Sequence, residues 1–281
     1  MIVIADSGSS KTDWLFMSPE KEYIISTHGI NPFFQQTEEI TSTLSSTFTN
    51  DQKEEVSEVY FYGAGCIKGK TDHVVSEALK RVFPKASIAV EDDILGAARA
   101  LLGKSSGIAC ILGTGTNSCL YNGSEIVDKV PTLGFILGDE GSGAYLGKLL
   151  MNDYFKRAIP EDLKQKMESE LHLEVADVLN SVYREEYPSR YLAKFSEFLS
   201  KNKNHIYVQN LIKRSFTDFF FRNIERYNDY QNYTVNFVGS IAYHYSDLLK
   251  EVAFNRKIEI GNIIDKPING LKKFHTNSEE K

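Results

Sequence analysis

The sequence predicts an α/β fold made of two related domains that face each other across a cleft. Short apolar runs rich in β-branched residues alternate with stretches of helical spacing, which places sheets at the centre with helices around them. A strand, a turn of small polar residues and a returning strand occur around Gly8 and again around Gly115, 107 residues later. We place the boundary in the small polar linker 103–107, which gives domains 1–104 and 105–281.

The first domain is expected to open with a hairpin that can bind an anion. Residues 2–5 form a buried-strand run, 14–17 form its partner, and 6–12 form the turn. Gly8 allows a ligand to approach the backbone closely, and exposed N–H groups beside hydroxyl and ammonium side chains can cradle a phosphate. Asp6, at the strand's end, is placed to hold Mg²⁺ or a water bound to it. The alternative is a polar turn without a ligand. A Walker loop is excluded by the missing Gly-x4-Gly-Lys spacing.

The remaining elements continue the alternation of strands and helices. Further strands are expected at 23–27, 56–62, 86–90, 108–112, 118–121, 125–130, 233–238 and 258–260. Helices are expected at 37–48, at 71–82 with Thr71-Asp72 as the cap, at 94–102, from 143 onward, over most of 153–232, at 241–254 and at 267–271. Aromatic residues in 153–232 recur at helical spacing and are assigned to a core. Residues 275–281 are expected to form a frayed tail.

Composition excludes several classes of partner. The net charge of −6 argues against a nucleic-acid surface, because neutralising phosphates needs a basic patch. No apolar run approaches the ~18 residues of a membrane span. Three cysteines, an odd number, lie in or beside strand-like runs, and no signal peptide is seen at Met1. These features lead us to expect a reduced, cytoplasmic compartment and a small-molecule substrate, without nucleic acid or membrane partners.

Four glycine turns at strand ends form one consistent set, at 6–12, 63–65, 113–117 and 239–240. This set resembles the actin / sugar-kinase / chaperone-ATPase superfamily, and within it the N-acetylglucosamine kinase-like group of the BadF/BadG/BcrA/BcrD ATPase family. The most specific part is the pairing of 112–117 with 138–142. The resemblance implies two duplicated ribonuclease H-like domains facing across a nucleotide cleft, which is the actin-like ATPase fold. It further implies a kinase that uses ATP and Mg²⁺ to phosphorylate the primary hydroxyl of an amino sugar, N-acetylglucosamine or a related N-acetylhexosamine; a homodimer stays open.

The resemblance also implies roles for individual residues. Asp6 would lie near Mg²⁺ and Ser10 near the transferred phosphoryl group. The nucleotide set is Asp6, Gly8, Ser9, Ser10, Lys11 and Thr12 in the first loop, Gly113, Thr114 and Gly115 in the second, and Gly239 and Ser240 on the adenosine side. The sugar set is Asn31, Gly65, Asp93, Thr116, Asn117, Gly134 and Asp139.

Asp93 matches the catalytic base of N-acetylhexosamine kinases, an Asp at the start of the helix that leads out of the first domain. Its alternative role is to cap that helix. Three acids in a row, 91–93, repel one another, which would raise the pKa of the least solvated, and Asp92 stays open as the base. Asp139 matches a ligand of a sugar hydroxyl, and capping the helix around Tyr145 is its alternative. Glu140 is assigned to the dipole of that helix.

Two departures from the family pattern leave the substrate open. Leu133 and Ile136 stand where mammalian members carry an aromatic residue and a His, which affects the contacts to the sugar's amide group. One alternative function is an ATPase activator of a radical dehydratase or reductase, which would need cysteines for an iron–sulfur cluster at a dimer seam. A sugar-sensing ROK repressor would need an N-terminal helix-turn-helix and a zinc cluster. A non-catalytic sugar or nucleotide binder is the third alternative.

Overall fold

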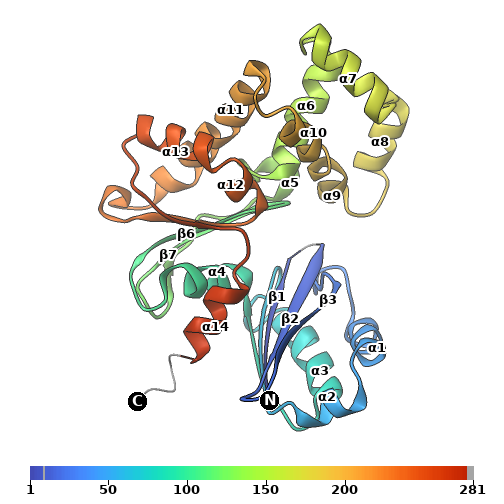
Figure 1. The fold of residues 1–281 in the computed structure, drawn as a ribbon, viewed down its shortest axis with the longest axis vertical. Coiled ribbons are helices and arrows are strands. Elements are labelled where there is room, and N and C mark those ends of the chain that lie inside the picture. The colour runs from blue at the N-terminus through green and yellow to red at the C-terminus, as the bar shows by residue number, and fades with distance from the viewer. Residues whose placement is uncertain (9, 277–281) are drawn as a thin grey trace. The chain divides into compact units, whose positions relative to one another are not determined.

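The computed structural model describes residues 1–8 and 10–276, and in it the chain forms two compact units. The first comprises Met1–Ser105, Gly123–Glu125 and the described residues from Lys266 onward, and the second comprises Ser106–Asn122 and Ile126–Asp265. Each unit is built on one five-stranded sheet (Figure 1). The first passage between the units lies inside the linker expected at 103–107. The C-terminal segment differs from the expected division, because it returns to the first unit.

The first unit contains a mixed sheet in the order β3-β2-β1-β4-β5. Strands β1, β2 and β3 are antiparallel neighbours, whereas β4 and β5 run parallel to β1. The strands are β1 (Ile2–Ser7), β2 (Lys11–Met17), β3 (Glu22–His28), β4 (Glu58–Gly63) and β5 (Ser87–Asp92). The helices are α1 (Thr37–Thr47), α2 (Asn50–Glu55), α3 (Asp72–Val82), α4 (Asp93–Leu102) and α14 (Ile268–Thr276).

Alternation along β1 divides its side chains between the two faces of this sheet. Val3 and Ala5 join the core beneath α1 and α3, whereas Ile4 joins a smaller cluster with Ile268 and Leu271 of α14. Figure 1 shows α1 and α3 on one side of the sheet and α4 and α14 on the other. Burial of the apolar face of α14 against β1 is the reason the C-terminal segment belongs to the first unit.

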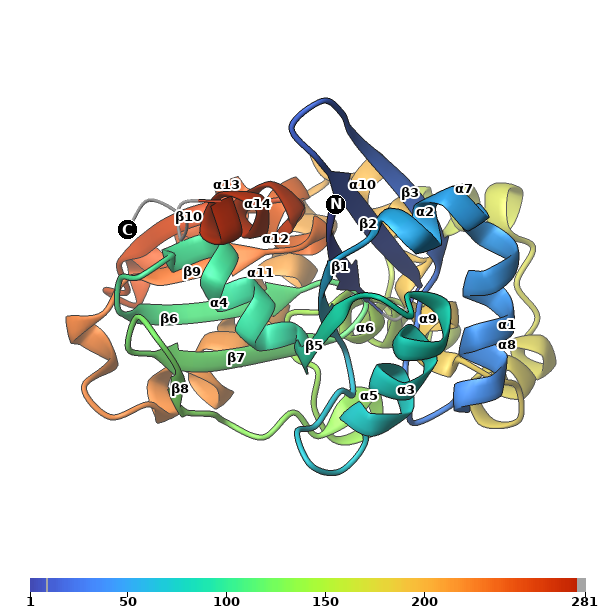
Figure 2. The same ribbon diagram turned by 90° about the horizontal axis from the view of Figure 1, so that it is seen from below.

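The second unit repeats the sheet strand for strand, in the order β8-β7-β6-β9-β10 (Figure 2). Again the first three strands are antiparallel neighbours and the last two run parallel to the first. The strands are β6 (Gly107–Leu112), β7 (Thr116–Tyr121), β8 (Ile126–Asp128), β9 (Val235–Val238) and β10 (Ile260–Ile264). This matching topology confirms the α/β class and the internal duplication.

The second unit differs from the first by a large helical insertion between β8 and β9. Its helices are α5 (Gly134–Leu137), α6 (Gly143–Phe155), α7 (Glu161–Leu171), α8 (Val175–Tyr183), α9 (Pro188–Ala193), α10 (Ser196–Lys201) and α11 (Ile206–Arg222), followed after β9 by α12 (Ser240–His244) and α13 (Ser246–Asn255). The aromatic side chains of this region are buried in the core, as expected. Among the helices of the described chain, none combines the length and apolar character needed to cross a bilayer.

Three local expectations were wrong. The helix expected at 241–254 is two helices, broken at Tyr245. Thr71 and Asp72 form no cap bond, because the Thr71 hydroxyl bonds the Gly65 carbonyl and Asp72 accepts from the Gly69 N–H. His275 is not part of a frayed tail: its ring stacks on Tyr60 with centroids 3.9 Å apart, and its Nε2 lies 2.9 Å from the Tyr62 hydroxyl. The rest of the expected tail, 277–281, lies outside the described residues.

Candidate active site

The first glycine turn joins β1 to β2 and carries two carboxylates on one face of the sheet. Asp6 and Asp13 are directly opposite each other in the antiparallel register, so their side chains are neighbours. Burial, together with the charge of Asp13, raises the pKa of Asp6 to about 7, and Lys266 opposes this shift. Asp6 is therefore partly protonated at neutral pH, and any cation that binds beside it would favour its charged form.

Asp13 is held ionised in spite of its own burial. Lys11 Nζ lies 2.6 Å from one of its oxygens and the Ser26 hydroxyl donates to the same oxygen at 2.6 Å. Lys266 Nζ lies 3.7 Å from the other oxygen. Burial disfavours the charged form, but these bonds and charges outweigh it and keep the pKa of Asp13 below its ordinary value. The pKa values of the two opposed carboxylates are thus shifted in opposite directions, up for Asp6 and down for Asp13.

The hydroxyls of Ser7 and Thr12 brace this hairpin from inside. Their oxygens lie 2.7 Å apart; Ser7 Oγ also bonds the N–H and the carbonyl of Ile30, and Thr12 Oγ1 bonds the His28 carbonyl. Both side chains are fully buried. The sequence assigns Thr12 to the nucleotide set, but its hydroxyl is engaged in hydrogen bonds inside the hairpin. Gly8 and Ser10 are exposed, the Gly8 N–H closes the turn on the Lys11 carbonyl, and Ser9 lies outside the described residues.

The donor set at Asp6 fits Mg²⁺ better than a metal that needs a full protein cage. No group of three or more His, Cys, Asp or Glu side chains among the described residues could hold a metal ion. Mg²⁺ usually keeps several waters and is held by one or two carboxylates plus phosphates of the substrate. Asp6, a partly buried carboxylate with no side-chain hydrogen bond to another described residue, meets that requirement.

Two loops of the first unit bring together the sugar residues assigned to it. Gly65, after β4, has φ +81°, and a Cβ there would lie 2.6 Å from Asn31 Oδ1 and 2.8 Å from the Phe33 ring. Asn31 Oδ1 accepts the Phe33 N–H at 2.9 Å. The amide Nδ2 of Asn31 thus stays available as a donor, and only glycine fits opposite it.

Asp93 lies at the end of β5 close to these loops. It is the first residue of α4, so the cap position belongs to Asp92, which makes no cap bond with its side chain. The helix-cap role considered for Asp93 is therefore wrong. Burial raises the pKa of the Cys66 thiol to about 12, and the charges of Asp93 and Asp92 add to this shift. Because Cys66 directly follows Gly65, the carboxylates lie within electrostatic reach of the Asn31–Gly65 contact.

The second glycine turn, between β6 and β7, is held by the first turn of α6. The N–H groups of Gly143 and Ala144 bond the carbonyls of Gly113 and Thr114 at 2.8 and 3.1 Å. The loop's own N–H of Gly113 bonds the Gly115 carbonyl at 3.0 Å. The β9–α12 turn packs against the same loop, since a Cβ on Gly239 would overlap the Leu112 carbonyl. Ser240 begins α12 immediately after this close approach.

Asp139 supplies a carboxylate to this second loop. Its Oδ1 accepts the Thr116 N–H at 3.3 Å, and its Oδ2 lies 3.1 Å from where a Cβ on Gly115 would be. Burial raises the pKa of Asp139, partly offset by the Thr116 bond. Ser142 caps α6, so the cap role considered for Asp139 is wrong. Glu140 forms an ion pair with Arg222 at 3.6 Å.

A cavity of about 390 Å³ opens beside Asp139 and Thr116. Leu133 lines it, whereas Ile136, the other departure from the family pattern, lines a different groove. The cavity wall also includes Arg222 and Arg226, which the sequence interpretation missed. They lie at and beyond the end of α11, more than 80 residues from Asp139, and no motif connects the two segments.

The geometry adds no support for a sugar-binding role at two residues of the second unit, Asn117 and Gly134. Asn117 turns its side-chain oxygen to the N–H of the next residue, Ser118, at 3.0 Å. Gly134 begins α5 with φ +72° and open space around its Cβ position. Their places in the sugar set still depend on the resemblance alone.

The three cysteines do not form a cluster site. Cys66, Cys110 and Cys119 are free thiols with buried side chains. Burial raises the pKa of Cys110 well above its ordinary value, which opposes the thiolate form that iron–sulfur ligation requires. This geometry gives no support to the radical-enzyme activator.

Comparison with known proteins identifies relatives among solved structures only. No family model and no curated protein sequence matches the chain. A candidate N-acetylglucosamine kinase from Porphyromonas gingivalis is 44% identical, with 99% of both chains covered and a TM-score of 0.94. A second candidate N-acetylglucosamine kinase, from Chromobacterium violaceum, is 15% identical over 97% of this chain and 98% of its own, with a TM-score of 0.70.

A more distant likeness concerns the fold alone. A ROK family glucokinase from Streptomyces griseus, solved with glucose and AMPPNP, is 11% identical over 98% of both chains, with a TM-score of 0.57. The Porphyromonas protein, in contrast, matches this chain from end to end at an identity that shows common family membership. The chain therefore belongs to the N-acetylglucosamine kinase-like family.

Proposed function

We propose that this protein transfers the γ-phosphoryl group of ATP to the primary hydroxyl of an N-acetylated hexosamine, with N-acetylglucosamine as the first candidate. The observation that carries the proposal is the carboxylate beside each glycine loop, Asp6 in the first unit and Asp139 in the second. Membership in a family with a candidate N-acetylglucosamine kinase supports the sugar class. The proposal assigns residues of both units to the same bound substrates.

Nucleotide binding is assigned to the two loops. Phosphoryl transfer depends on positioning and on neutralising charge, more than on covalent help from the protein. Within the Gly113–Gly115 turn the Gly113 N–H bonds the Gly115 carbonyl, so the N–H groups of Thr114 and Gly115, together with the ammonium of Lys11, would contact phosphate oxygens. When bound, Mg²⁺ neutralises charge on the phosphates, and Asp6 is the residue that would hold it.

The acceptor is assigned to Asn31, Asp139 and Asp93. Asn31 offers its amide N–H₂, because its oxygen is already bonded to Phe33. The Asp139 carboxylate accepts from a sugar hydroxyl. Asp93 takes the proton of the primary hydroxyl as that oxygen attacks the γ-phosphorus. The bond between the γ-phosphorus and the β,γ-bridging oxygen breaks at the same centre, and ADP leaves.

Steady-state kinetics on a panel of sugars tests this assignment. We expect ADP release that depends on N-acetylglucosamine, N-acetylgalactosamine or N-acetylmannosamine, and is weaker with glucose or glucosamine. Asp93→Asn should lower kcat by ~10²–10⁴-fold with little change in the KM for sugar, as for a general base. Asp139→Asn should chiefly raise the KM for sugar.

Two outcomes would contradict the proposal. If Asp92→Asn loses the turnover and Asp93→Asn keeps it, the base is Asp92. If the parent protein phosphorylates none of these sugars yet hydrolyses ATP slowly without them, the kinase function itself fails. Circular dichroism of each variant checks that a lost activity does not reflect lost folding.

A further inference from the structure

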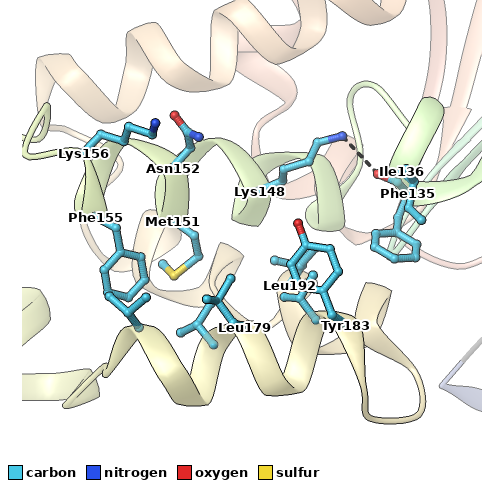
Figure 3. Close-up of a pocket in the computed structure, with 13 residues that line it drawn as sticks. Phe135, Ile136, Lys148, Met151, Asn152, Phe155, Lys156, Leu179, Tyr183 and Leu192 are labelled. Carbon is cyan, nitrogen blue, oxygen red and sulfur yellow. Dashed lines mark hydrogen bonds between the residues drawn. The ribbon is translucent and has the colours of Figure 1, made fainter.

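The second unit contains a groove between α6 and α8, apart from every residue assigned to nucleotide or sugar (Figure 3). Its volume is about 440 Å³, inside the ~300–1,000 Å³ range of small-molecule sites. Figure 3 shows Met151 and Phe155 of α6 facing Leu179 of α8 across it. Phe135 and Ile136 of α5 close one end. The wall is thus almost entirely apolar.

The groove leaves apolar side chains of α8 in water. Val175, Leu179 and Tyr183 follow one another at successive turns, and they are 51%, 51% and 78% exposed. The buried side of this helix is carried by Val178. These residues share one apolar face of the helix with Val178, and a surface helix normally packs such a face against the core, so its incomplete covering here is unexplained by the fold. Contiguous exposed apolar surface of this kind marks a binding site.

Two polar side chains of α6 and that of Lys156, the residue at its C-cap, form a rim above the apolar wall. Lys148, Asn152 and Lys156 are spaced four residues apart, so they share one face of the helix over ~12 Å. Lys148 Nζ donates to the Phe135 carbonyl at 3.0 Å. Among the described residues neither Lys148 nor Lys156 forms an ion pair within 4.0 Å, and the lining of the groove includes no carboxylate. The charges of Glu140 and Asp139 act on the Lys148 ammonium, so Lys156 is the cationic donor that remains for a ligand's carboxylate.

We propose that this groove binds an amphipathic carboxylate, whose apolar body lies against Met151, Phe155 and Leu179 and whose charged end bonds the lysine rim. Charge-assisted N–H···O bonds are the strong ones at a partly desolvated site. A second copy of this chain is a poorer occupant, because an isologous interface centred on this groove would bring two lysine rims close together. A neutral lipid would offer the Lys156 ammonium no counter-charge.

The proposed ligand would also contact the segment that leads to Asp139. Phe135 and Ile136 belong to α5, which ends at Leu137, two residues before Asp139. The Lys148 bond to the Phe135 carbonyl connects the rim to the same short helix. An occupied groove should therefore slow hydrogen exchange at the amides of 135–137 as well as in α8.

Calorimetric titration with decanoate tests the proposal, with decanol as the matched probe that lacks the charge. We expect one site for decanoate and binding at least ~10-fold weaker for decanol. Leu179→Asp places a carboxylate in the groove and should abolish decanoate binding. Its control is Phe254→Asp, the same kind of change at a side chain of α13 that is 82% exposed, which should leave binding unchanged.

A variant that removes one charge distinguishes the contribution of the lysine rim to binding from that of the apolar wall. Lys156→Gln should weaken decanoate binding several-fold and leave decanol binding unchanged, whereas Lys250→Gln on α13 should alter neither. Equal affinity for decanoate and decanol, or decanoate binding that survives Leu179→Asp, would overturn the proposal. The proposal would also be overturned if the parent protein bound no decanoate and sedimented as a dimer, and if Leu179→Asp dissociated that dimer. These readouts need no turnover, so they are independent of the kinase assignment.

Discussion

The two glycine hairpins share a topology but acquire their charge in different ways. The first carries its carboxylates within the hairpin itself, at Asp6 and Asp13, and fixes its turn with buried hydroxyls. The second has no acid in its turn and receives Asp139 from a distant segment, while α6 and the β9–α12 turn pack closely on its backbone. Two copies of one framework can thus keep the same strand order while the acidic side chains beside their loops come from different segments of the chain.

This difference predicts that Gly239, which packs against the second hairpin, is required for stability. Gly8, in the turn of the first hairpin, should be dispensable for folding. Gly239 has φ +119°, and a Cβ there would overlap the Leu112 carbonyl, so Gly239→Ala should lower the free energy of unfolding by ~3 kcal/mol or more. Gly8 has an ordinary φ, and its Cβ would meet only the Lys11 carbonyl at 3.9 Å. Gly8→Ala should change stability by less than ~0.5 kcal/mol. Urea denaturation of both variants measures this contrast, and equal losses would break the comparison.

The first hairpin should also make stability depend on pH. The pKa of Asp6 is raised to about 7 in the folded protein, above its value of ~4 in the unfolded chain, so the folded state binds the extra proton. Its contribution is therefore full below about pH 4 and is lost as the pH rises to about 7. The parent should lose ~2 kcal/mol relative to Asp6→Asn between about pH 5.0 and 6.5.

Asp13 provides the opposite control in the same hairpin. Its pKa lies below the ordinary value, so its contribution is present above the unfolded pKa and is lost as the pH falls. The stability of the parent relative to Asp13→Asn should therefore fall as the pH drops below about 4 and stay constant between about pH 5.0 and 6.5, where the parent and Asp6→Asn diverge. Parallel curves for the parent and Asp6→Asn would show that Asp6 titrates normally.

Sequence patterns predicted what depends on periodicity and local turn chemistry. The apolar runs located both hairpins, and the spacing of Gly8 and Gly115 indicated the duplication that the sheet topology confirms. Contacts between distant segments were not predictable in this way. The return of α14 to the first unit depends on the fit of Ile268 and Leu271 against β1, and the position of Arg222 beside Asp139 depends on how α11 packs. Neither leaves a local signal in the chain.

Thr12 is a residue of the first hairpin for which the motif and the structure suggest different roles. Sequence places it among nucleotide ligands, yet its hydroxyl is buried between Ser7 and the His28 carbonyl. Thr12→Val keeps the shape and leaves Ser7 short of a partner, so it should lower the free energy of unfolding by ~1–2 kcal/mol without changing the KM for ATP. Ser10→Ala, at an exposed position, should do the reverse: stability within ~0.5 kcal/mol of the parent and a higher KM for ATP. If Thr12→Val raises the KM for ATP as much as Ser10→Ala does, the hydroxyl contacts the nucleotide after all, and the division between bracing and binding residues in this hairpin is wrong.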